Sequence, residues 1–494
     1  MGEIWYEPLS ATDRSFLLFE RRATHMHLGG VTIFEAGTLG RPGGGVDIDR
    51  IRAYIASRLP LIPRYRQRLA YVPWEGSPVW VDDERFNLDY HVRHTAVPRP
   101  GDERQLKQLA GRLMSIPLDR RRPLWEAWVV EGLQDDRFAI VLKTHHAVVD
   151  GVSGVDLMAT LLQPAPVETF EPAAPWRPRP APSGAQLLRD RLLERFSLPS
   201  ELVRGALGAL TDPKATFRKA TRALDRSWSF LRSGLHFPSS TPLNQPIGPF
   251  RRFDWQALPL AGAKEIKNRW GGTVNDVVLA TVAGAVRRYL LRKMVSVDGV
   301  DFRAVVPVSL RRPEDRSTTG NRVSAWLLSL PVHEPDPLQR YRALVAETER
   351  RKRTHEERAL EVFTRVAEVM NPLLTLGVRV AMSLAPFNLI VTNVPGPQFP
   401  LFLLGARLLS GYPTVPLFDY QGLGVAIFSY DGQLLFGLNA DFDVVPDLHE
   451  FAADLVAAFA ELRQMHQSLA DPAPRREPRQ AQLRHRGSGG RQRR

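Results

Sequence analysis

A proline-rich stretch, residues 164–185, divides the chain into two long and regularly patterned halves. Its sequence, PAPVETFEPAAPWRPRPAPSGA, has neither the period of a helix nor that of a strand and is typical of a linker. On both sides of it, segments with strand-like patterning are followed by segments with the spacing of amphipathic helices. The pattern predicts an α/β protein of two halves, and a length of 494 residues, too long for one simple core, agrees with this.

The same patterns set the expected order of segments along the chain. An N-terminal half at 1–163 precedes the linker and a run of amphipathic helices at 164–244, and a C-terminal half at 245–470 precedes a basic tail at 471–494. Strands are expected at residues 124–133, 137–146, 302–311 and 432–443, and helices at residues 47–69, 186–236, 273–293 and 448–465.

The net charge of +13 is concentrated at the C-terminus. Residues 475–494 hold eight arginines and one glutamate without an apolar period, so we expect this tail to be disordered. A basic tail without aromatic side chains suits anionic lipid headgroups as well as phosphates, or it stays solvated without a fixed partner. Because the rest of the chain carries only a modest excess of positive charge, we do not expect a nucleic-acid-binding protein.

Composition and hydropathy limit which catalytic and metal-binding groups the chain can use and where in the cell it is expected. The chain has no cysteine, which excludes disulfides, thiolate metal ligands and a cysteine nucleophile, and which fits a reducing cytoplasm. The N-terminus lacks a basic stretch followed by an apolar one, so no signal peptide is expected. The most apolar long window, residues 373–391, is interrupted by Arg379, Pro386 and Asn388. We therefore expect a cytoplasmic protein that can lie on a membrane without crossing it.

The stretch THHAVVDGVSG, residues 144–154, is the strongest candidate for a functional site. It places His145 and His146 at the end of a predicted strand, with Asp150 and Gly151 before a helical pattern. A metal site is disfavoured, because adjacent side chains on a strand point to opposite faces and no second cluster of ligands has suitable spacing. A histidine acting as general base is favoured, while Asp150 can also be a helix N-cap. No nucleophile elbow or phosphate-binding loop is present, which favours direct attack by an acceptor hydroxyl over a covalent serine intermediate.

At this point the sequence resembles the bacterial wax ester synthase/acyl-CoA:diacylglycerol acyltransferases. The likeness spans nearly the whole chain except the linker and the tail, and it implies two chloramphenicol acetyltransferase-like halves with mixed sheets and a tunnel at their interface. Besides HHAVVDG, the segments that carry it, in family order, are PLSATDRSFLLFE (8–20), MHLGG (26–30), PLDRRRPLWE (117–126), VNDVVLA (274–280), PVSLR (307–311), GNRVS (320–324), TNVPGP (392–397) and YDGQLLFGLNAD (430–441).

The resemblance assigns expected roles within the histidine motif. His146 matches the family's general base, and His145 matches an additional histidine whose role stays open. Asp150 matches a structural aspartate, and Gly151 allows the tight turn that a side chain would crowd.

Three residues of the C-terminal half also receive expected roles. Asn275 and Asp276 match the family's Asn-Asp motif, and we expect Asn275 to steady the oxyanion, although it can instead be a helix N-cap. Asp276 is expected to give structural support. Arg311 follows a predicted strand and is our candidate partner for Asp150, with a plain surface arginine as the alternative.

The activity that the resemblance implies is transfer of a long-chain acyl group from acyl-CoA to diacylglycerol or to a long-chain alcohol. Acyl-CoA would be a co-substrate, and neither a metal nor another cofactor is expected. The expected location is peripheral, at the inner face of the plasma membrane or on lipid droplets. Two alternatives remain: an acyltransferase of the same fold acting on a polyketide, peptide or sugar hydroxyl, and a non-catalytic lipid-surface protein.

Overall fold

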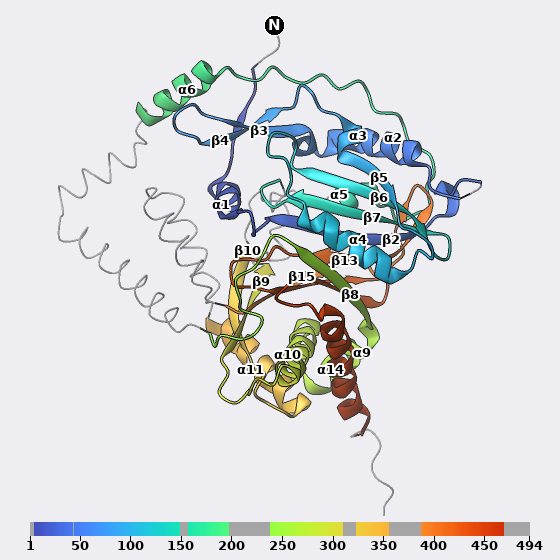
Figure 1. Ribbon diagram of the computed structural model, residues 1–494, viewed down its shortest axis with the longest axis vertical. Helices are drawn as coiled ribbons and strands as arrows, with labels where there is room; N and C mark the ends of the chain where they lie inside the picture. Colours follow the sequence, from blue (N-terminus) through green and yellow to red (C-terminus); the bar gives the residue numbers. More distant parts are fainter. Residues whose placement is uncertain are drawn as a thin grey trace, which may run out of the picture.

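The protein folds into two six-stranded mixed sheets, each with helices packed against it (Figure 1). A third sheet of three short strands lies beside the first and carries the N-terminal segment. The mixed α/β class expected from the sequence is confirmed. The computed structural model describes residues 4–42, 44–148, 157–196, 238–309, 323–354 and 387–468.

The first half supplies the three-stranded sheet, most of the first large sheet and the helices around them. Its elements are β1 (Glu7–Pro8), α1 (Ala11–Phe19), β2 (His27–Glu35), η1 (Gly37–Leu39), α2 (Ile48–Arg58), η2 (Leu59–Leu61), η3 (Pro63–Arg66), β3 (Gln67–Tyr71), β4 (Pro78–Asp82), α3 (Leu88–His91), β5 (Val92–Ala96), α4 (Glu103–Ser115), β6 (Trp125–Leu133), β7 (Arg137–His145), α5 (Leu157–Leu161) and α6 (Gly184–Phe196).

The second half supplies the second large sheet and the helices that cover it. Its elements are β8 (Arg251–Pro259), α9 (Leu260–Trp270), α10 (Val274–Arg292), β9 (Phe302–Ser309), β10 (Val323–Leu330), α11 (Pro337–Thr354), β11 (Leu389–Pro395), β12 (Phe402–Leu403), β13 (Ala406–Thr414), β14 (Leu423–Tyr430), β15 (Gln433–Asp441) and α14 (Leu448–Ser468).

The first large sheet has the strand order β12-β13-β2-β7-β6-β5. Its central strands β2 and β7 are antiparallel, and their register places His27 opposite His145. Strands β12 and β13 come from late in the chain, so the second half completes the sheet of the first half. The strand that carries the histidine motif is therefore central in its sheet.

The second large sheet has the order β10-β9-β11-β14-β15-β8, with β11 parallel to both of its neighbours. Helices α10 and α14 pack on one another below this sheet (Figure 1). The helix α10 is buried along most of its length, because its sequence VNDVVLATVAGAV is apolar on almost every face. Each large sheet thus has its own hydrophobic core.

The two sheets meet along β13, which contacts both β14 and β15. At this contact Gly437 faces the backbone of Pro413, and a Cβ atom at Gly437 would lie 1.8 Å from the Pro413 carbonyl oxygen. Nearby, the indole of Trp255 in β8 stacks on the ring of Tyr412, with centroids 5.0 Å apart. Close backbone approach, which only glycine permits here, joins the two large sheets.

Most of the expected elements are present, and one expected helix is shorter. The helix expected at 47–69 ends at Arg58, and residues 67–71 form β3 instead. Pro60 and Pro63 explain the difference, because proline cannot continue a helix and its ring clashes with the preceding turn. The turn between β6 and β7 has positive φ at Asp135 and Asp136.

The proline-rich stretch is irregular, as expected, but it is packed against the first half. Arg179 donates from Nη2 to Asp82 Oδ1 at 2.8 Å and from Nε to Asp82 Oδ2 at 2.9 Å. Trp176 lies edge-on to Phe86. Of the helices expected at 186–236, α6 is described; residues 197–237 lie outside the described ranges, as does the basic tail.

Within the part of the chain that the structure describes, no helix has both the length and the apolar content needed to cross a membrane. Most of the apolar window at 373–391 lies outside that part.

Candidate active site

The two histidines of the motif have different surroundings. His145 is the last residue of β7 and is fully buried, whereas His146 begins the following turn and keeps partial exposure. The His145 amide donates to the Leu124 carbonyl, and the His146 amide donates to the Met26 carbonyl at 2.8 Å. The strand therefore ends between them, with His145 in the core and His146 at its boundary.

The imidazole of His146 lies flat on the ring of Phe16 in α1, with centroids 3.7 Å apart and planes inclined by 20°. Burial lowers the pKa of His146 to about 4, and the neighbouring His145 acts in the same direction. Its Nδ1 is buried and accepts no hydrogen bond from the described residues. At neutral pH the ring is thus neutral, which is the form that can accept a proton.

The side chain of His145 turns back toward its own loop and toward α1. Its Nδ1 accepts a hydrogen bond from the Ala147 amide at 3.0 Å. Its Nε2 lies 3.6 Å from Oε2 of Glu20, an electrostatic contact that is too long for a direct hydrogen bond. The sequence could not assign a role to this histidine. The structure shows that its ring contacts the Ala147 amide and the Glu20 carboxylate.

Glu20 follows α1 directly and pairs with Arg120, whose Nε donates to Glu20 Oε2 at 2.7 Å. The carboxylate is largely buried, with 10% of the side chain exposed. Burial alone raises the pKa of Glu20, but its contacts with His145 and Arg120 outweigh burial and hold the pKa below its usual value. The group is therefore an anion next to the buried histidine.

A second buried histidine, His27, lies opposite His145 on β2. Its Nε2 is 3.8 Å from Glu20 Oε1, and neither ring nitrogen makes a hydrogen bond with a described residue. Burial, followed by the positive charges of Lys143 and Arg251, lowers the pKa of His27 well below its usual value. Across the described residues, no group of three or more His, Asp or Glu side chains is arranged to hold a metal ion.

The loop between Glu20 and His27 is held by the second half of the protein. Arg251 in β8 donates to the Ala23 carbonyl, and its amide donates to Ser115 Oγ at 2.8 Å. Thr24 donates from Oγ1 to Asp419 Oδ1 at 3.1 Å. The histidine site therefore lies close to the junction of the two halves.

Asn275 and Asp276 lie in the first turn of α10 and have different roles. The N-cap of this helix is Thr273, so the alternative that Asn275 is the cap is wrong. The Oδ1 atom of Asn275 instead accepts from Asn393 Nδ2 at 3.3 Å, which joins the VNDVVLA and TNVPGP segments. Whether Asn275 contacts the oxyanion stays a prediction.

Asp276 is a buried structural residue. Its Oδ2 accepts from the amide and the hydroxyl of Thr273, both at 2.7 Å, which closes a capping box at the start of α10. Its Oδ1 accepts from Thr348 Oγ1 at 2.8 Å, which ties α10 to α11. These bonds fit the structural support that the sequence suggested.

Three predicted site residues, Asp150, Gly151 and Arg311, lie outside the described ranges. The proposed pairing of Asp150 with Arg311 and the turn at Gly151 therefore stay predictions.

Four residues that surround the histidine pair were not singled out from the sequence, namely Phe16, Glu20, His27 and Arg120. All four belong to segments that carry the family resemblance, at 8–20, 26–30 and 117–126. The sequence signal that could have identified them was an aromatic or ionisable residue inside each short segment. Only the folded chain, however, brings these segments together around the histidines.

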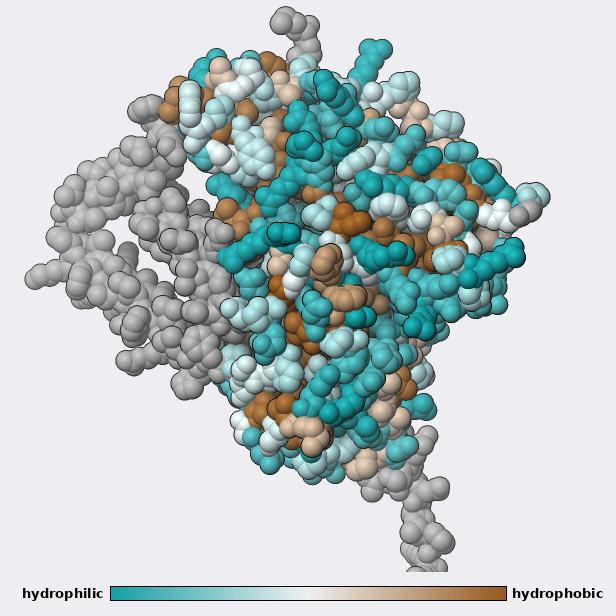
Figure 2. All heavy atoms as spheres, viewed as in Figure 1, coloured by the Kyte–Doolittle hydropathy of each residue, from teal (hydrophilic) through white to brown (hydrophobic). Residues whose placement is uncertain are grey.

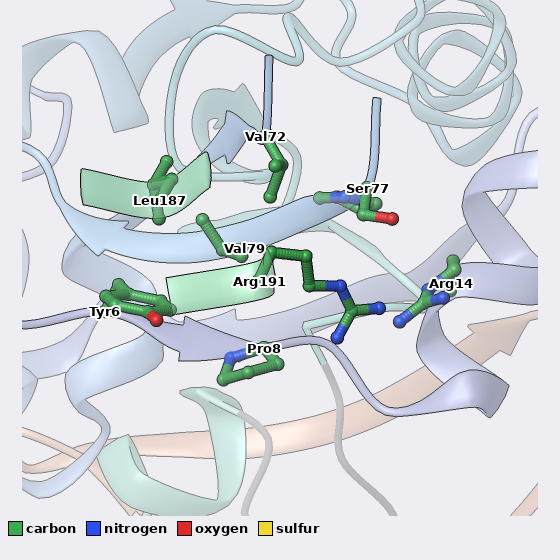
Figure 3. Close-up of a pocket in the computed structure, with 9 residues that line it drawn as sticks. Tyr6, Pro8, Arg14, Val72, Ser77, Val79, Leu187 and Arg191 are labelled. Atoms are coloured by element: carbon green, nitrogen blue, oxygen red, sulfur yellow. The ribbon is translucent and has the colours of Figure 1, made fainter. Parts of the chain in front are cut away.

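Two described pockets lie away from the histidines. One, of about 20 Å³ and lined by Tyr6, Arg14 and Arg191 among others (Figure 3), has room for little more than a water molecule. The other, of about 900 Å³, is lined by Ala36 and Arg137, at the opposite end of β2 and β7 from the histidines. The interface tunnel expected from the resemblance stays a prediction.

Comparison with known proteins identifies the family. Residues 9–278 match the wax ester synthase/diacylglycerol acyltransferase catalytic domain, and residues 319–463 match the WS/DGAT C-terminal domain. The chain is 34% identical over 460 residues to the probable diacylglycerol O-acyltransferase tgs1 of Mycobacterium tuberculosis, covering 92% of this chain and 95% of that protein. It is 36% identical over 467 residues to tgs2 of the same species, covering 92% and 98%.

Solved structures agree with the sequence relatives. The wax ester synthase/diacylglycerol acyltransferase from Marinobacter aquaeolei VT8 superposes with a TM-score of 0.66 at 28% identity, covering 93% of this chain and 100% of that one. A starter condensation domain of rhizomide synthetase shares the fold, with a TM-score of 0.54 at 14% identity over 94% of each chain. The expected resemblance is thus confirmed, and the chain belongs to the wax ester synthase/diacylglycerol acyltransferase family of acyltransferases.

Proposed function

We propose that the protein transfers a long-chain acyl group from acyl-CoA to the hydroxyl of diacylglycerol, and also to long-chain alcohols, with His146 as general base. The observation that carries this proposal is a neutral imidazole close to the junction of the two halves. The ring stacks on Phe16, and the backbone amide of the same residue is held by the Met26 carbonyl. The family assignment supports the same chemistry, because its described members are named as diacylglycerol acyltransferases or wax ester synthases.

The reaction requires one proton to move twice. His146 takes the proton of the acceptor hydroxyl while that oxygen attacks the thioester carbonyl, which gives a tetrahedral oxyanion. When the carbon–sulfur bond breaks, the imidazolium returns the proton to the CoA thiolate, so ester and free CoA leave. Base catalysis of this kind contributes about 10²–10⁴-fold, and positioning and electrostatics supply the rest. The chemistry calls for neither a metal nor a further cofactor.

A pKa of about 4 makes the free imidazole a weak base, so the reacting groups have to raise its proton affinity. The developing oxyanion does this, because a nearby negative charge favours the imidazolium. The nearby Glu20 carboxylate acts in the same sense through His145, whose Nε2 it faces at 3.6 Å. Removing water from the site strengthens both effects.

Asn275 is our candidate for steadying the oxyanion. An amide donor aimed at the oxyanion position contributes about 10²–10³-fold in comparable enzymes. The hydrogen bond from Asn393 occupies the carbonyl oxygen of Asn275, which leaves its NH₂ group as the donor for a substrate. This orientation supports the assignment.

Diacylglycerol is the favoured acceptor, because two mycobacterial relatives that match nearly the full chain are named as diacylglycerol O-acyltransferases. The decisive experiment measures CoA release from palmitoyl-CoA with diacylglycerol, with hexadecanol and with no acceptor, for the wild type and for His146→Ala. We expect acceptor-dependent release by the wild type and a loss of at least 10²-fold in the variant. No release with either lipid would refute the acyltransferase proposal, and near-normal turnover by His146→Ala would refute the assignment of the base.

We further propose that the protein attaches peripherally to a membrane or lipid-droplet surface through the β3–β4 hairpin and the helix α6. Trp74 at the tip of the hairpin is 93% exposed, and Tyr71 beside it is 47% exposed. On α6, Leu192 is 45% exposed and Leu193 is 60% exposed. Figure 2 shows hydrophobic side chains among hydrophilic ones in the region of α6.

The hairpin and the helix form one surface. Leu187 on the inner side of α6 packs on Val72 and Val79 of the hairpin. Arg191 pairs with Glu75 at 3.1 Å, which joins the helix to the turn. Arg189 is 72% exposed on the same helix, and a cation beside exposed Trp and Leu side chains is the composition of interfacial membrane contacts.

Vesicle flotation with phosphatidylcholine and phosphatidylglycerol tests the attachment. We expect the double variant Trp74→Ser with Leu193→Ser to float several-fold less well than the wild type, while it still turns over substrate dispersed in detergent. Met294→Ser is the matched control, because Met294 is 92% exposed but lies in the second half. Equal flotation of all three proteins would refute the role of this surface. Deletion of residues 475–494 tests separately whether the basic tail adds to binding.

A further inference from the structure

We propose that Glu20, held by Arg120, is a positioning residue that fixes His145 and, through it, the turn that presents His146. This proposal rests on the proposed role of His146 as general base. It gives a function to His145, and it links the segments at 8–20 and 117–126 to the histidine motif.

The hydrogen bonds of His145 define which of its nitrogens carries the proton. A neutral imidazole has one donor and one acceptor nitrogen. Because Nδ1 accepts the Ala147 amide at 3.0 Å, the proton has to be on Nε2. That nitrogen faces Glu20 Oε2 at 3.6 Å, so the carboxylate favours the tautomer that the turn requires.

Glu20 is itself held in place from two directions. Arg120 donates from Nε to its Oε2 at 2.7 Å, and the same guanidinium donates from Nη2 to the Leu17 carbonyl at 2.8 Å. The backbone amide of Glu20 donates to the Phe16 carbonyl at 3.1 Å and so ends α1. The carboxylate is therefore tied, through Arg120, to the helix end that carries Phe16.

These contacts reach His146 by two routes. The first is the turn, in which the Ala147 amide bonds to the His145 ring and the Val148 amide bonds to the His145 carbonyl at 2.9 Å. The second is the stacked ring of Phe16, one helical turn before Glu20. Glu20 is the residue that both routes share.

The charges around Glu20 explain why a carboxylate is needed at this position. His145, His27 and Arg120 face it within 4 Å, while Lys143 and Arg251 add positive charge near His27. Without the anion, His145 would lose the group that favours its Nε2 proton. An amide at position 20 keeps the shape of the side chain but removes its charge.

The test is steady-state kinetics of Glu20→Gln with palmitoyl-CoA and diacylglycerol. We expect kcat to fall about 10–100-fold, the range found when the partner that orients a metal-ligating histidine is removed, with little change in KM. His145→Asn keeps an acceptor near the δ position but lacks the donor that faces Glu20, so we expect a similar loss. The double variant should lose little more than either single variant, because both break the same interaction.

Asp82→Asn is the matched control for general loss of stability. Asp82 is also a buried carboxylate of the first half paired with an arginine, Arg179, but it has no contact with the histidines. We expect Asp82→Asn to lower Tm about as much as Glu20→Gln and to leave kcat within about twofold, because it does not alter the turn.

Two results would overturn the positioning role while leaving the proposed function intact. One is a Glu20→Gln variant with wild-type kcat although His146→Ala is inactive. The other is a double variant in which the separate losses multiply, since independent sites act additively in free energy. Absence of turnover in the wild type would instead contradict the proposed function itself.

Discussion

The ring of Phe16 covers one face of the His146 imidazole at a centroid distance of 3.7 Å. Phe16 comes from the helix at the start of the chain, whereas His146 follows a central strand of the first large sheet. The stack fixes the tilt of the imidazole and keeps water from that face. It also accounts for part of the burial that lowers the pKa of His146 to about 4.

Replacement of Phe16 tests the value of this stack. Aromatic pairs contribute about 0.5–1.5 kcal/mol beyond the area they bury, so we expect Phe16→Leu to lower kcat about 2–12-fold. The KM for acyl-CoA should change little, because the ring orients the base. Phe19→Leu on the same helix is the control, since Phe19 packs on Phe418 instead. Equal losses in both variants would show that the effect belongs to the helix and not to the stack.

The pH dependence of kcat/KM reports the protonation of His146 in the free enzyme. Because the folded pKa is about 4 and not 6.5, the imidazole stays neutral when the pH falls from 8 to 6. We expect kcat/KM to be nearly constant over this interval and to fall only at lower pH. A fall in kcat/KM with its midpoint near pH 6.5, the usual pKa of histidine, would contradict the buried environment of the ring. Measurements at each pH should follow a stability check at that pH.

Replacement of Asn275 should lower activity, whereas replacement of its neighbour Asp276 should lower stability. We expect Asn275→Ala to lower kcat by about 10²–10³-fold with little change in Tm, as for loss of an oxyanion donor. Asn393→Ala should lower kcat less, because it only frees the carbonyl oxygen of Asn275.

Asp276→Ala removes a buried carboxylate that caps α10 and accepts from Thr348. We expect it to cost about 1–3 kcal/mol in the free energy of unfolding, measured by urea denaturation. A stable Asp276→Ala protein with normal Tm would contradict the capping role.

Acidification should destabilise the fold through its buried histidines. In the unfolded chain a histidine takes up a proton near pH 6.5, but burial keeps His146 and His27 neutral in the folded state to lower pH. The unfolded state then binds more protons, so stability falls as the pH drops below about 6.5. For His146 alone the expected loss between pH 7.5 and 5.5 is about 1 kcal/mol.

Urea denaturation at these two pH values measures the loss. His146→Gln should reduce the difference by about that amount. Glu20 adds a further loss only at more acidic pH, because its folded pKa lies below its usual value and its stabilisation disappears as the carboxylate becomes protonated.

Local patterns in the sequence were sufficient for most individual elements. The strands at 124–133 and 137–146 correspond to β6 and β7, and the helix at 273–293 corresponds to α10. Their periods report which face is buried, and burial of that face is what stabilises them. The helix expected at 47–69 ends at Arg58, because Pro60 and Pro63 stop it although the apolar period continues.

The sequence alone determined the class of fold, the family and the candidate base, because these depend on local periods and on short motifs. It could not determine which segments meet around that base. The contact of Glu20 with His145, the pairing of β13 with β2, and the stack of Phe16 on His146 join residues far apart in the chain. Such contacts depend on strand register and on where the helices pack. Both are set when the faces of sheets and helices are buried against each other, and no local sequence pattern specifies them. The role proposed for His145 therefore followed only from the tertiary structure.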